Sequence, residues 1–213
     1  MDRETLERAF DERFSPEVKE RLRAGRVAIA GLGGLGSNIA VMLARTGVGH
    51  IKMIDYDLVD VTNLNRQAYN IPQVGMEKTK ALREILMQIN PYLDYEFEQI
   101  KVTEENLVDI FAGYPIVCEA FDKADQKAML VQGILTGFAD TIVVSGNGMA
   151  GYGDANMVQT RHKLRRLYIC GDENTDIEDG IGLMAPRVTV CAAHQANKVI
   201  QLILEDMKVY ESI

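Results

Sequence analysis

Four closely spaced glycines and a later aspartate are the first residues in this sequence whose spacing indicates chemistry. The glycines are Gly31, Gly33, Gly34 and Gly36, and Asp55 follows them at the distance of about 20 residues that is typical of dinucleotide-type folds. Glycine lets a backbone approach a ligand without a Cβ in the way. A helix that begins there points unpaired N–H groups and its positive dipole end at phosphate. The pattern predicts a nucleotide site without deciding which nucleotide binds.

A strand, a helix and a second strand must position these residues. An apolar run over residues 27–30 predicts a buried strand. Apolar spacing over residues 35–45 predicts a helix with Gly47 as its C-cap. A second apolar run over residues 51–54 leads into Asp55, whose carboxylate can accept hydrogen bonds from ribose hydroxyls. Together these elements form the first unit of a nucleotide-binding α/β sheet.

Similar alternation continues along the chain and predicts its fold class. We expect two short N-terminal helices, the second beginning at Ser15-Pro16. Further helices are expected within residues 74–91 and over 103–111, 125–138 and 188–205, with strands at 95–100, 115–119 and 141–145. Residues 155–160 and 167–169 predict short strands that can pair antiparallel. The class is therefore α/β: a Rossmann-like, mostly parallel sheet flanked by helices, with a few antiparallel strands in the C-terminal half.

Two further charged residues occupy positions that favour ligand contact. Lys78 lies near the start of an expected helix, where the dipole disfavours a cation unless its side chain points at an anion. Asp122 follows an expected strand, and ligands of open α/β sheets gather at the carboxyl ends of strands. The residues alone leave open that Lys78 is an ordinary surface lysine and Asp122 an ordinary turn aspartate.

Composition fits one compact domain that is neither membrane-spanning nor nucleic-acid-binding. The chain has 213 residues, 47% of them hydrophobic, and a net charge of −8. It has no long uncharged apolar run, and its charged N-terminus lacks the apolar centre of a signal peptide, so we expect a cytoplasmic protein. Three cysteines without a C-x-x-C pair give no disulfide framework.

The segment after the second strand identifies a family. Residues 55–67 read DYDLVDVTNLNRQ and follow GLGGLG at residues 31–36. The longer motif resembles the D-x-D-x-V-x-x-x-N-L-x-R-Q signature of the ThiF/MoeB family, the adenylyltransferases of sulfur-carrier proteins, whose adenylation domain ubiquitin-activating enzymes share. The resemblance extends from about residue 26 to the final helix.

The resemblance implies roles for individual residues. It places Arg66 and Lys78 on the phosphates of ATP and makes Asp122 the ligand of Mg²⁺, with Glu119 and Lys123 replacing two other residues of the family's D-x-x-D-N motif. It also implies that an N-terminal arginine, Arg13 in our interpretation or else Arg8, reaches the ATP of a neighbouring subunit. The implied nucleotide ligands are Gly31, Gly33, Gly34, Gly36, Asp55, Asp57, Asn63, Arg66, Gln67 and Lys78.

The implied activity is the adenylation of a carboxylate. ATP would activate the C-terminal glycine of a small ubiquitin-like carrier ending in Gly-Gly, forming an acyl-adenylate and pyrophosphate, with a ThiS-like carrier of thiamin biosynthesis as the expected partner. A homodimer is implied. Two anions must meet in such a site, so positive charge matters more than acid–base chemistry. We expect one domain over residues 1–213, with an N-terminal helical segment (1–25), a nucleotide-binding core (26–145) and a carrier-binding half (146–213).

Departures from the family pattern and rival functions complete the interpretation. Many relatives bind zinc through two C-x-x-C pairs, which are missing here, so no structural zinc is expected. Residues 171–182 resemble the family's crossover loop but contain no cysteine for a covalent carrier link. The basic cluster at residues 161–166 could steer an acidic partner. An NAD-dependent oxidoreductase, a non-catalytic partner subunit and a tRNA-modifying enzyme of the same family are the alternatives.

Overall fold

A computed structural model describes residues 2–176 and 180–205 of the chain. Its strands are β1 (Arg26–Ala30), β2 (His50–Asp55), β3 (Asp94–Gln99), β4 (Ile116–Glu119), β5 (Ile142–Gly146), β6 (Gln159–Leu164) and β7 (Leu167–Gly171). Its α-helices are α1 (Arg3–Asp11), α2 (Pro16–Ala24), α3 (Gly34–Thr46), α4 (Lys78–Ile89), α5 (Leu107–Phe111), α6 (Ala124–Gly137) and α7 (Ala185–Leu204). Short 3₁₀ turns cover Val61–Asn63, Ile71–Gln73 and Ala155–Met157.

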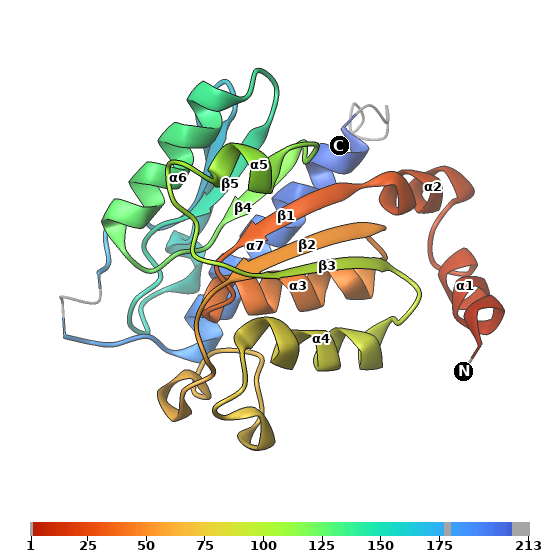
Figure 1. The fold of residues 1–213 in the computed structure, drawn as a ribbon, viewed down its shortest axis with the longest axis horizontal. Coiled ribbons are helices and arrows are strands. Elements are labelled where there is room, and N and C mark those ends of the chain that lie inside the picture. Colours follow the sequence, from red (N-terminus) through yellow and green to blue (C-terminus); the bar gives the residue numbers. More distant parts are fainter. Residues whose placement is uncertain (1, 177–179, 206–213) are drawn as a thin grey trace.

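The strands form one sheet in the order β3-β2-β1-β4-β5-β7-β6 (Figure 1). Every neighbouring pair is parallel except β6 and β7, which run antiparallel. Because parallel strands share a direction, the carboxyl ends of β1, β2, β4 and β5 meet at one edge of the sheet. The predicted α/β class, with its mostly parallel sheet and C-terminal antiparallel pair, is confirmed.

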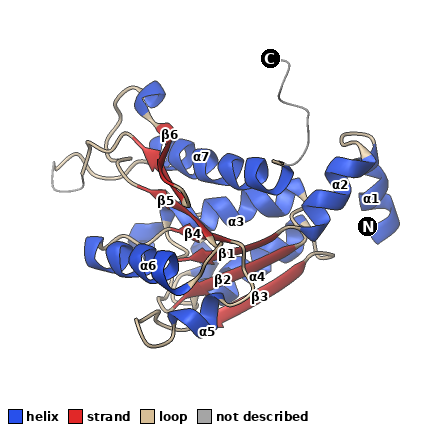
Figure 2. Cartoon of the chain, turned by 90° about the horizontal axis from the view of Figure 1, so that it is seen from above, coloured by secondary structure: helices blue, strands red, loops and turns tan. Residues whose placement is uncertain are grey.

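Helices cover both faces of the sheet. Apolar residues of α3, α4 and α7 pack on one face and those of α5 and α6 on the other (Figure 2). The central strand β1 reads RVAIA and is buried from Val27 to Ala30, as expected of a strand covered on both sides. Helix α3 ends at Gly47, whose φ of 89° supplies the left-handed C-cap that the sequence predicts. Within residues 2–176 and 180–205, no helix combines the length and apolarity needed to cross a membrane.

The structure corrects the strand predicted at residues 155–160. Asp154 accepts a hydrogen bond from the amide of Asn156 at 2.9 Å and caps a 3₁₀ turn there. The strand is instead Gln159–Leu164, so most of the basic cluster lies within β6 rather than between two strands. This edge strand is largely exposed, and its polar sequence therefore lacks the alternation that identifies a half-buried strand.

Two predicted helices begin later than expected. The amide of Thr103, the first residue of the helix predicted over residues 103–111, donates to the Asn106 side chain, and the helix itself spans Leu107–Phe111. Helix α4 begins at Lys78 rather than Val74, because Gly75 has a φ of 89° and donates its amide to the Val59 carbonyl. A helix end depends on local capping contacts that apolar spacing does not report.

Candidate nucleotide site

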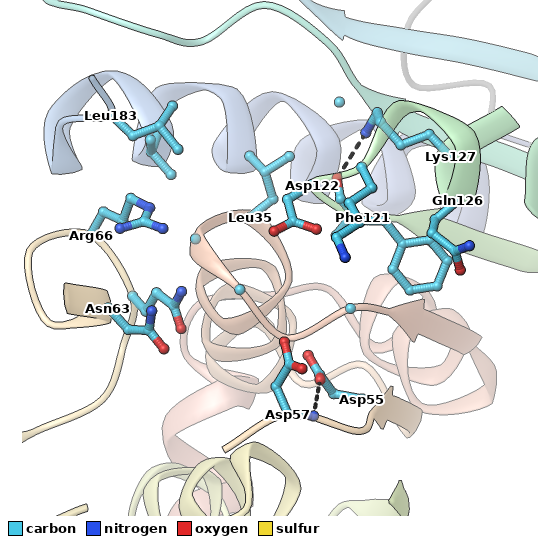
Figure 3. A pocket seen from close by; sticks show the side chains of 18 of the residues that line it. Leu35, Asp55, Asp57, Asn63, Arg66, Phe121, Asp122, Gln126, Lys127 and Leu183 are labelled. Carbon is cyan, nitrogen blue, oxygen red and sulfur yellow. Dashed lines mark hydrogen bonds between the residues drawn. The ribbon is translucent and has the colours of Figure 1, made fainter. Parts of the chain in front are cut away.

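A cavity of about 490 Å³ lies at the carboxyl edge of the sheet. Its walls come from the glycine turn, the segment after β2, the loop after β4 and the loop after β5. Figure 3 shows Asp55 and Asp57 in one part of it, Arg66 and Asn63 in a second, and Asp122 in a third. Open α/β sheets bind ligands at this edge, so the topology brings together residues from distant parts of the chain.

The glycine turn between β1 and α3 requires glycine at two positions. Gly31 has a φ of 89°, and a Cβ there would lie 2.8 Å from the Ala120 carbonyl oxygen. A Cβ on Gly36 would lie 1.8 Å from the carbonyl oxygen of Gly31. Gly31, Gly33 and Gly34 line the cavity. Gly36 packs against the turn and is not among the lining residues, so it shapes the site instead of facing a ligand.

Asp55 holds this turn in place. Its carboxylate accepts a hydrogen bond from the Leu32 amide at 2.6 Å and another from the Asp57 amide at 2.8 Å. The residue is 6% exposed but reaches the cavity. Tyr69 supports the same turn from behind, because its hydroxyl donates to the Leu32 carbonyl at 2.8 Å. Asp55 thus has a structural role in addition to the ribose contact predicted for it.

Lys78 reaches the cavity from the first residue of α4. Its ammonium lies 2.9 Å from the Asp57 carboxylate and 3.8 Å from that of Asp55, and the residue is 6% exposed. In this structure, the anions that offset the unfavourable helix dipole are these two carboxylates. The predicted phosphate contact therefore requires Lys78 to share its charge between acids and ligand, or to exchange partners.

Arg66, Asn63 and Gln67 lie on the turn after β2. The Arg66 guanidinium donates to the Thr62 carbonyl at 3.0 Å and borders the cavity, with Asn63 beside it (Figure 3). The Asn63 side-chain oxygen accepts the Asp60 amide at 3.0 Å and so fixes the turn. The side-chain oxygen of Gln67 is buried without a hydrogen-bond partner among the described residues. All three predicted ligands are therefore grouped on one wall.

The loop after β4 separates two carboxylates of different kinds. Glu119 is fully buried and accepts hydrogen bonds from the Ser145 hydroxyl at 2.5 Å and the Phe121 amide at 2.7 Å, with the Lys127 ammonium at 2.8 Å. Asp122 is exposed in the cavity, and its carboxylate has no hydrogen bond or ion pair within the described chain. The Glu119 carboxylate is therefore occupied by partners within the protein, whereas the Asp122 carboxylate is accessible to a ligand.

The single carboxylate of Asp122 is compatible with Mg²⁺ bound beside phosphates. The described residues contain no group of three His, Cys, Asp or Glu side chains that could cage a metal ion. Mg²⁺ commonly uses one or two carboxylates, substrate phosphates and several waters instead. Asp122 meets that requirement only if a phosphate-bearing ligand shares the cavity.

Arg13 lies far from this cavity within one chain. Helices α1 and α2 lie at the end of the sheet where β1 begins (Figure 1). Arg8 belongs to α1 and Arg13 follows it, and neither residue lines the cavity. Both residues are exposed. The predicted role of Arg13 therefore requires a second subunit and stays a prediction.

Sequence reasoning missed several lining residues. Lys101 and Val102 follow β3, Phe121 follows β4, Asn147 follows β5, and Lys127 lies in the first turn of α6. The same rule that selected Asp122, a position just after a parallel strand, was the available signal for most of them. Several side chains of the basic cluster at residues 161–166 have partners within the chain. Arg161 and Lys163 pair with Glu173, and the Arg166 guanidinium donates to the carbonyls of Leu135 and Thr141.

Comparisons with known proteins agree with the motif and the fold. Residues 6–212 match the ThiF family. The chain belongs to the ThiF family. The molybdopterin-synthase adenylyltransferase of Salmonella typhimurium is 30% identical over 197 residues, which cover 89% of this chain and 77% of that protein. The adenylyltransferase and sulfurtransferase MOCS3 of Culex quinquefasciatus is 30% identical over 86% of this chain, which spans only 43% of that relative.

Solved structures show the same ThiF-type architecture. The E. coli tRNA N6-threonylcarbamoyladenosine dehydratase TcdA, in complex with AMP, has a TM-score of 0.81 and 23% identity, covering 90% of this chain and 91% of TcdA. At that identity the likeness concerns the fold alone. The family resemblance predicted from residues 55–67 is confirmed, and the curated relatives are adenylyltransferases, in agreement with the predicted nucleotidyltransferase class. Thiamin biosynthesis is not named for any of these proteins.

Proposed function

We propose that this ThiF-family protein transfers AMP from ATP to the C-terminal carboxylate of a small ubiquitin-like carrier ending in Gly-Gly. A carboxylate oxygen attacks the α-phosphorus, the bond from that phosphorus to the bridging oxygen breaks, and pyrophosphate leaves. The observation that supports this best is the convergence of Arg66, Lys78, Asp122 and the glycine turn on one cavity. The glycine turn on its own would not indicate that Arg66, Lys78 and Asp122 share its cavity.

The charges of the cavity suit a reaction between two anions. Lys78 and Arg66 supply positive charge near the turn, and Lys101 adds more from the loop after β3. Fixed cations stabilise the charge that develops on the transferring phosphate without reorganising during the reaction. None of these groups is needed as a general acid, because the attacking carboxylate is already ionised near neutral pH. Catalysis by this chain is therefore positioning and electrostatic stabilisation.

Nucleotide contacts follow from the lining residues. The N-terminus of α3 faces the phosphates across Gly33 and Gly34. Asp57 and Asp55 lie where ribose hydroxyls bind in this class of fold. Ile100, Val102 and Phe121 give the same cavity an apolar section, which suits the adenine ring. Asp122 would hold Mg²⁺, which neutralises the pyrophosphate when bound.

The partner and assembly are part of the proposal. A ThiS-like carrier of the thiamin pathway and a molybdopterin-type carrier are the first candidates, the second because of the Salmonella relative. We also propose a homodimer in which Arg13 completes the neighbouring site, since Arg13 does not line the nucleotide cavity of its own chain. The acidic balance of −8 opposes nucleic acid as the main partner.

Exchange of pyrophosphate into ATP tests this function directly. We expect exchange that depends on a carrier with an intact Gly-Gly end and that falls to background when the terminal glycine is removed. A threonylcarbamoyladenosine-modified tRNA forms a separate arm, because the structural likeness to TcdA makes it the leading rival substrate. Exchange that requires the tRNA, or exchange that needs neither substrate, would refute the proposal.

A further inference from the structure

Two loops that line the nucleotide cavity meet at one buried ion pair. Asp172 directly follows β7, and Arg187 lies in the first turn of α7; their side chains are 4% and 5% exposed. The Arg187 guanidinium pairs with the Asp172 carboxylate and donates to the Asp154 carbonyl at 2.9 Å. Arg187 therefore joins the loop after β5, the loop after β7 and the start of α7.

Stability alone does not account for this pair. A cation in the first turn of a helix opposes the helix dipole, and burying both charges removes their hydration, which their attraction barely repays. The Nε atom of Arg187 is also buried without a hydrogen-bond partner in the described structure. An apolar pair of similar size would meet the packing need at lower cost. The cost of the buried ion pair is explained if the protein requires the loop geometry that the pair imposes.

Asp172 imposes that geometry on the residues that follow it. Its carboxylate accepts the amides of Asn174 at 2.8 Å and Thr175 at 2.9 Å, and also the Thr175 hydroxyl at 2.9 Å. Thr175 and Asp176 line the cavity. The Asp172 amide donates to the Gly148 carbonyl at 2.9 Å, and Gly148 lines the cavity too. One wall of the cavity is thus built on the Asp172–Arg187 pair.

This wall is distinct from the part of the cavity that the predicted ATP ligands line. The residues predicted to contact nucleotide or Mg²⁺ lie on the glycine turn, on residues 55–78 and at Asp122. None of them lies on residues 147–150 or 172–176. The wall is therefore available to the second substrate.

We propose that Arg187 is a positioning residue for the carboxylate substrate. Through Asp172 it fixes Asn174 and Thr175, so that the carrier's C-terminal tail meets a preformed surface beside the phosphates. This inference rests on the function proposed above. Preorganisation of this kind lowers the entropy cost of bringing the two reactants together.

Replacing Arg187 by methionine tests the inference, because the side chain keeps its length and loses its charge. We expect the KM for the carrier that supports exchange to rise between about tenfold and a hundredfold, while the Kd for ATP stays within about threefold of wild type. Amide hydrogen exchange at residues 174 and 175 should accelerate, and exchange across residues 31–37 should not. Arg187→Lys should restore part of the carrier affinity. Arg45→Met, an exposed arginine on α3, is the matched control and should change nothing.

Two results would overturn the inference. One is an Arg187→Met protein with unchanged amide exchange at residues 174 and 175 and an unchanged carrier KM. The other is an equal loss of ATP and carrier affinity, which would indicate a general structural role. If Arg187→Met does not fold, Asp172→Asn weakens the same ion pair with little change of shape, and the same outcomes apply. Failure of the proposed function would appear differently, as a wild type without carrier-dependent exchange, and the amide measurement would still decide whether Arg187 orders the loop.

Discussion

Lys78 and Asp57 form an ion pair 2.9 Å long at the edge of the nucleotide cavity. The lysine is buried at the N-terminus of α4, where its charge is tolerated because Asp57 and Asp55 face it. A phosphate that enters the cavity competes with Asp57 for this ammonium. The pair therefore orients the ammonium before ATP arrives, which is the preorganisation that electrostatic catalysis requires.

Lys78→Met should abolish most of the pyrophosphate exchange. We expect a loss of about a hundredfold or more, the usual consequence of removing one charge-stabilising group from an active site. Lys80→Met is the control, because Lys80 is exposed on the same helix and pairs with Glu77 at the surface. Equal activities of the two variants in steady-state exchange would show that Lys78 is an ordinary structural lysine.

Asp122→Ala should raise the Mg²⁺ concentration needed for activity. The exposed carboxylate would otherwise share the ion with the phosphates. Titrating Mg²⁺ in the exchange assay at fixed ATP should show a higher midpoint and a lower maximum for the variant. Asp125→Ala, which removes a nearby exposed aspartate of α6, serves as the comparison. The metal assignment fails if both variants follow the wild-type curve.

At an Mg²⁺ concentration too low for Asp122→Ala chains to work alone, mixing them with Arg13→Ala chains should restore activity if Arg13 acts across a dimer. Arg13→Ala chains keep Asp122, and Asp122→Ala chains keep Arg13, so each mixed dimer has one complete site. Random mixing should give roughly a quarter of the wild-type rate. A parallel mixture made with Arg8→Ala identifies which arginine is used. A single-chain mass in solution would exclude the dimer, and no recovery on mixing would exclude the action of Arg13 across it.

The three cysteines should be unreactive in the native protein. Burial raises the pKa of Cys118, and burial also raises the pKa of Cys170 to about 11 and of Cys191 to about 12. Few thiolates are therefore present near neutral pH. A chromogenic disulfide reagent should label none of them until the protein unfolds, and then all three. Rapid labelling of native Cys170, next to residues 171–182, would support the hypothesis of a covalent link between this cysteine and the carrier.

Asp172 should contribute to stability in a pH-dependent way. Burial on its own raises its pKa, but the amides of Thr175 and Asn174, the Thr175 hydroxyl and the Arg187 guanidinium outweigh burial and lower the pKa from 3.8 to about 2. Because the folded pKa is depressed, this stability is present above the unfolded value and is lost as the pH falls through the folded one.

Asp172→Asn measures that contribution. The shift corresponds to about 2 kcal/mol of unfolding free energy near neutral pH. Urea unfolding should show this difference from wild type above about pH 5, and the difference should shrink as the pH approaches the folded pKa of Asp172. A difference that does not vary with pH would mean that packing, not charge, is lost in the variant.

The nucleotide-binding unit could be predicted from the sequence because its signals are local. The apolar run of β1, the glycines and Asp55 lie within a single stretch, and each has one dominant structural explanation. Position after a parallel strand also placed Asp122 in the cavity, because strand direction fixes which ends meet.

Contacts between distant segments could not be predicted in this way. Nothing in the spacing of Glu119, Ser145 and Lys127 indicates that they form one buried cluster. The same holds for Arg187 and Asp172, whose pairing depends on how α7 crosses the sheet. Exposed edge strands such as β6 are difficult to predict from sequence, because a strand without a buried face shows no alternation of apolar and polar residues.

Helix α7 contacts the sheet and the cavity wall at two points on one side. Its Gln195 side chain is fully buried and donates to the carbonyls of Glu119 and Val144, while Arg187 holds Asp172 about two turns earlier. The rotation of α7 about its axis therefore fixes where Arg187 lies relative to the strand ends that Gln195 contacts. One residue inserted between these two points would turn Arg187 away by roughly 100°, so this interval should resist length variation that ordinary surface loops accept.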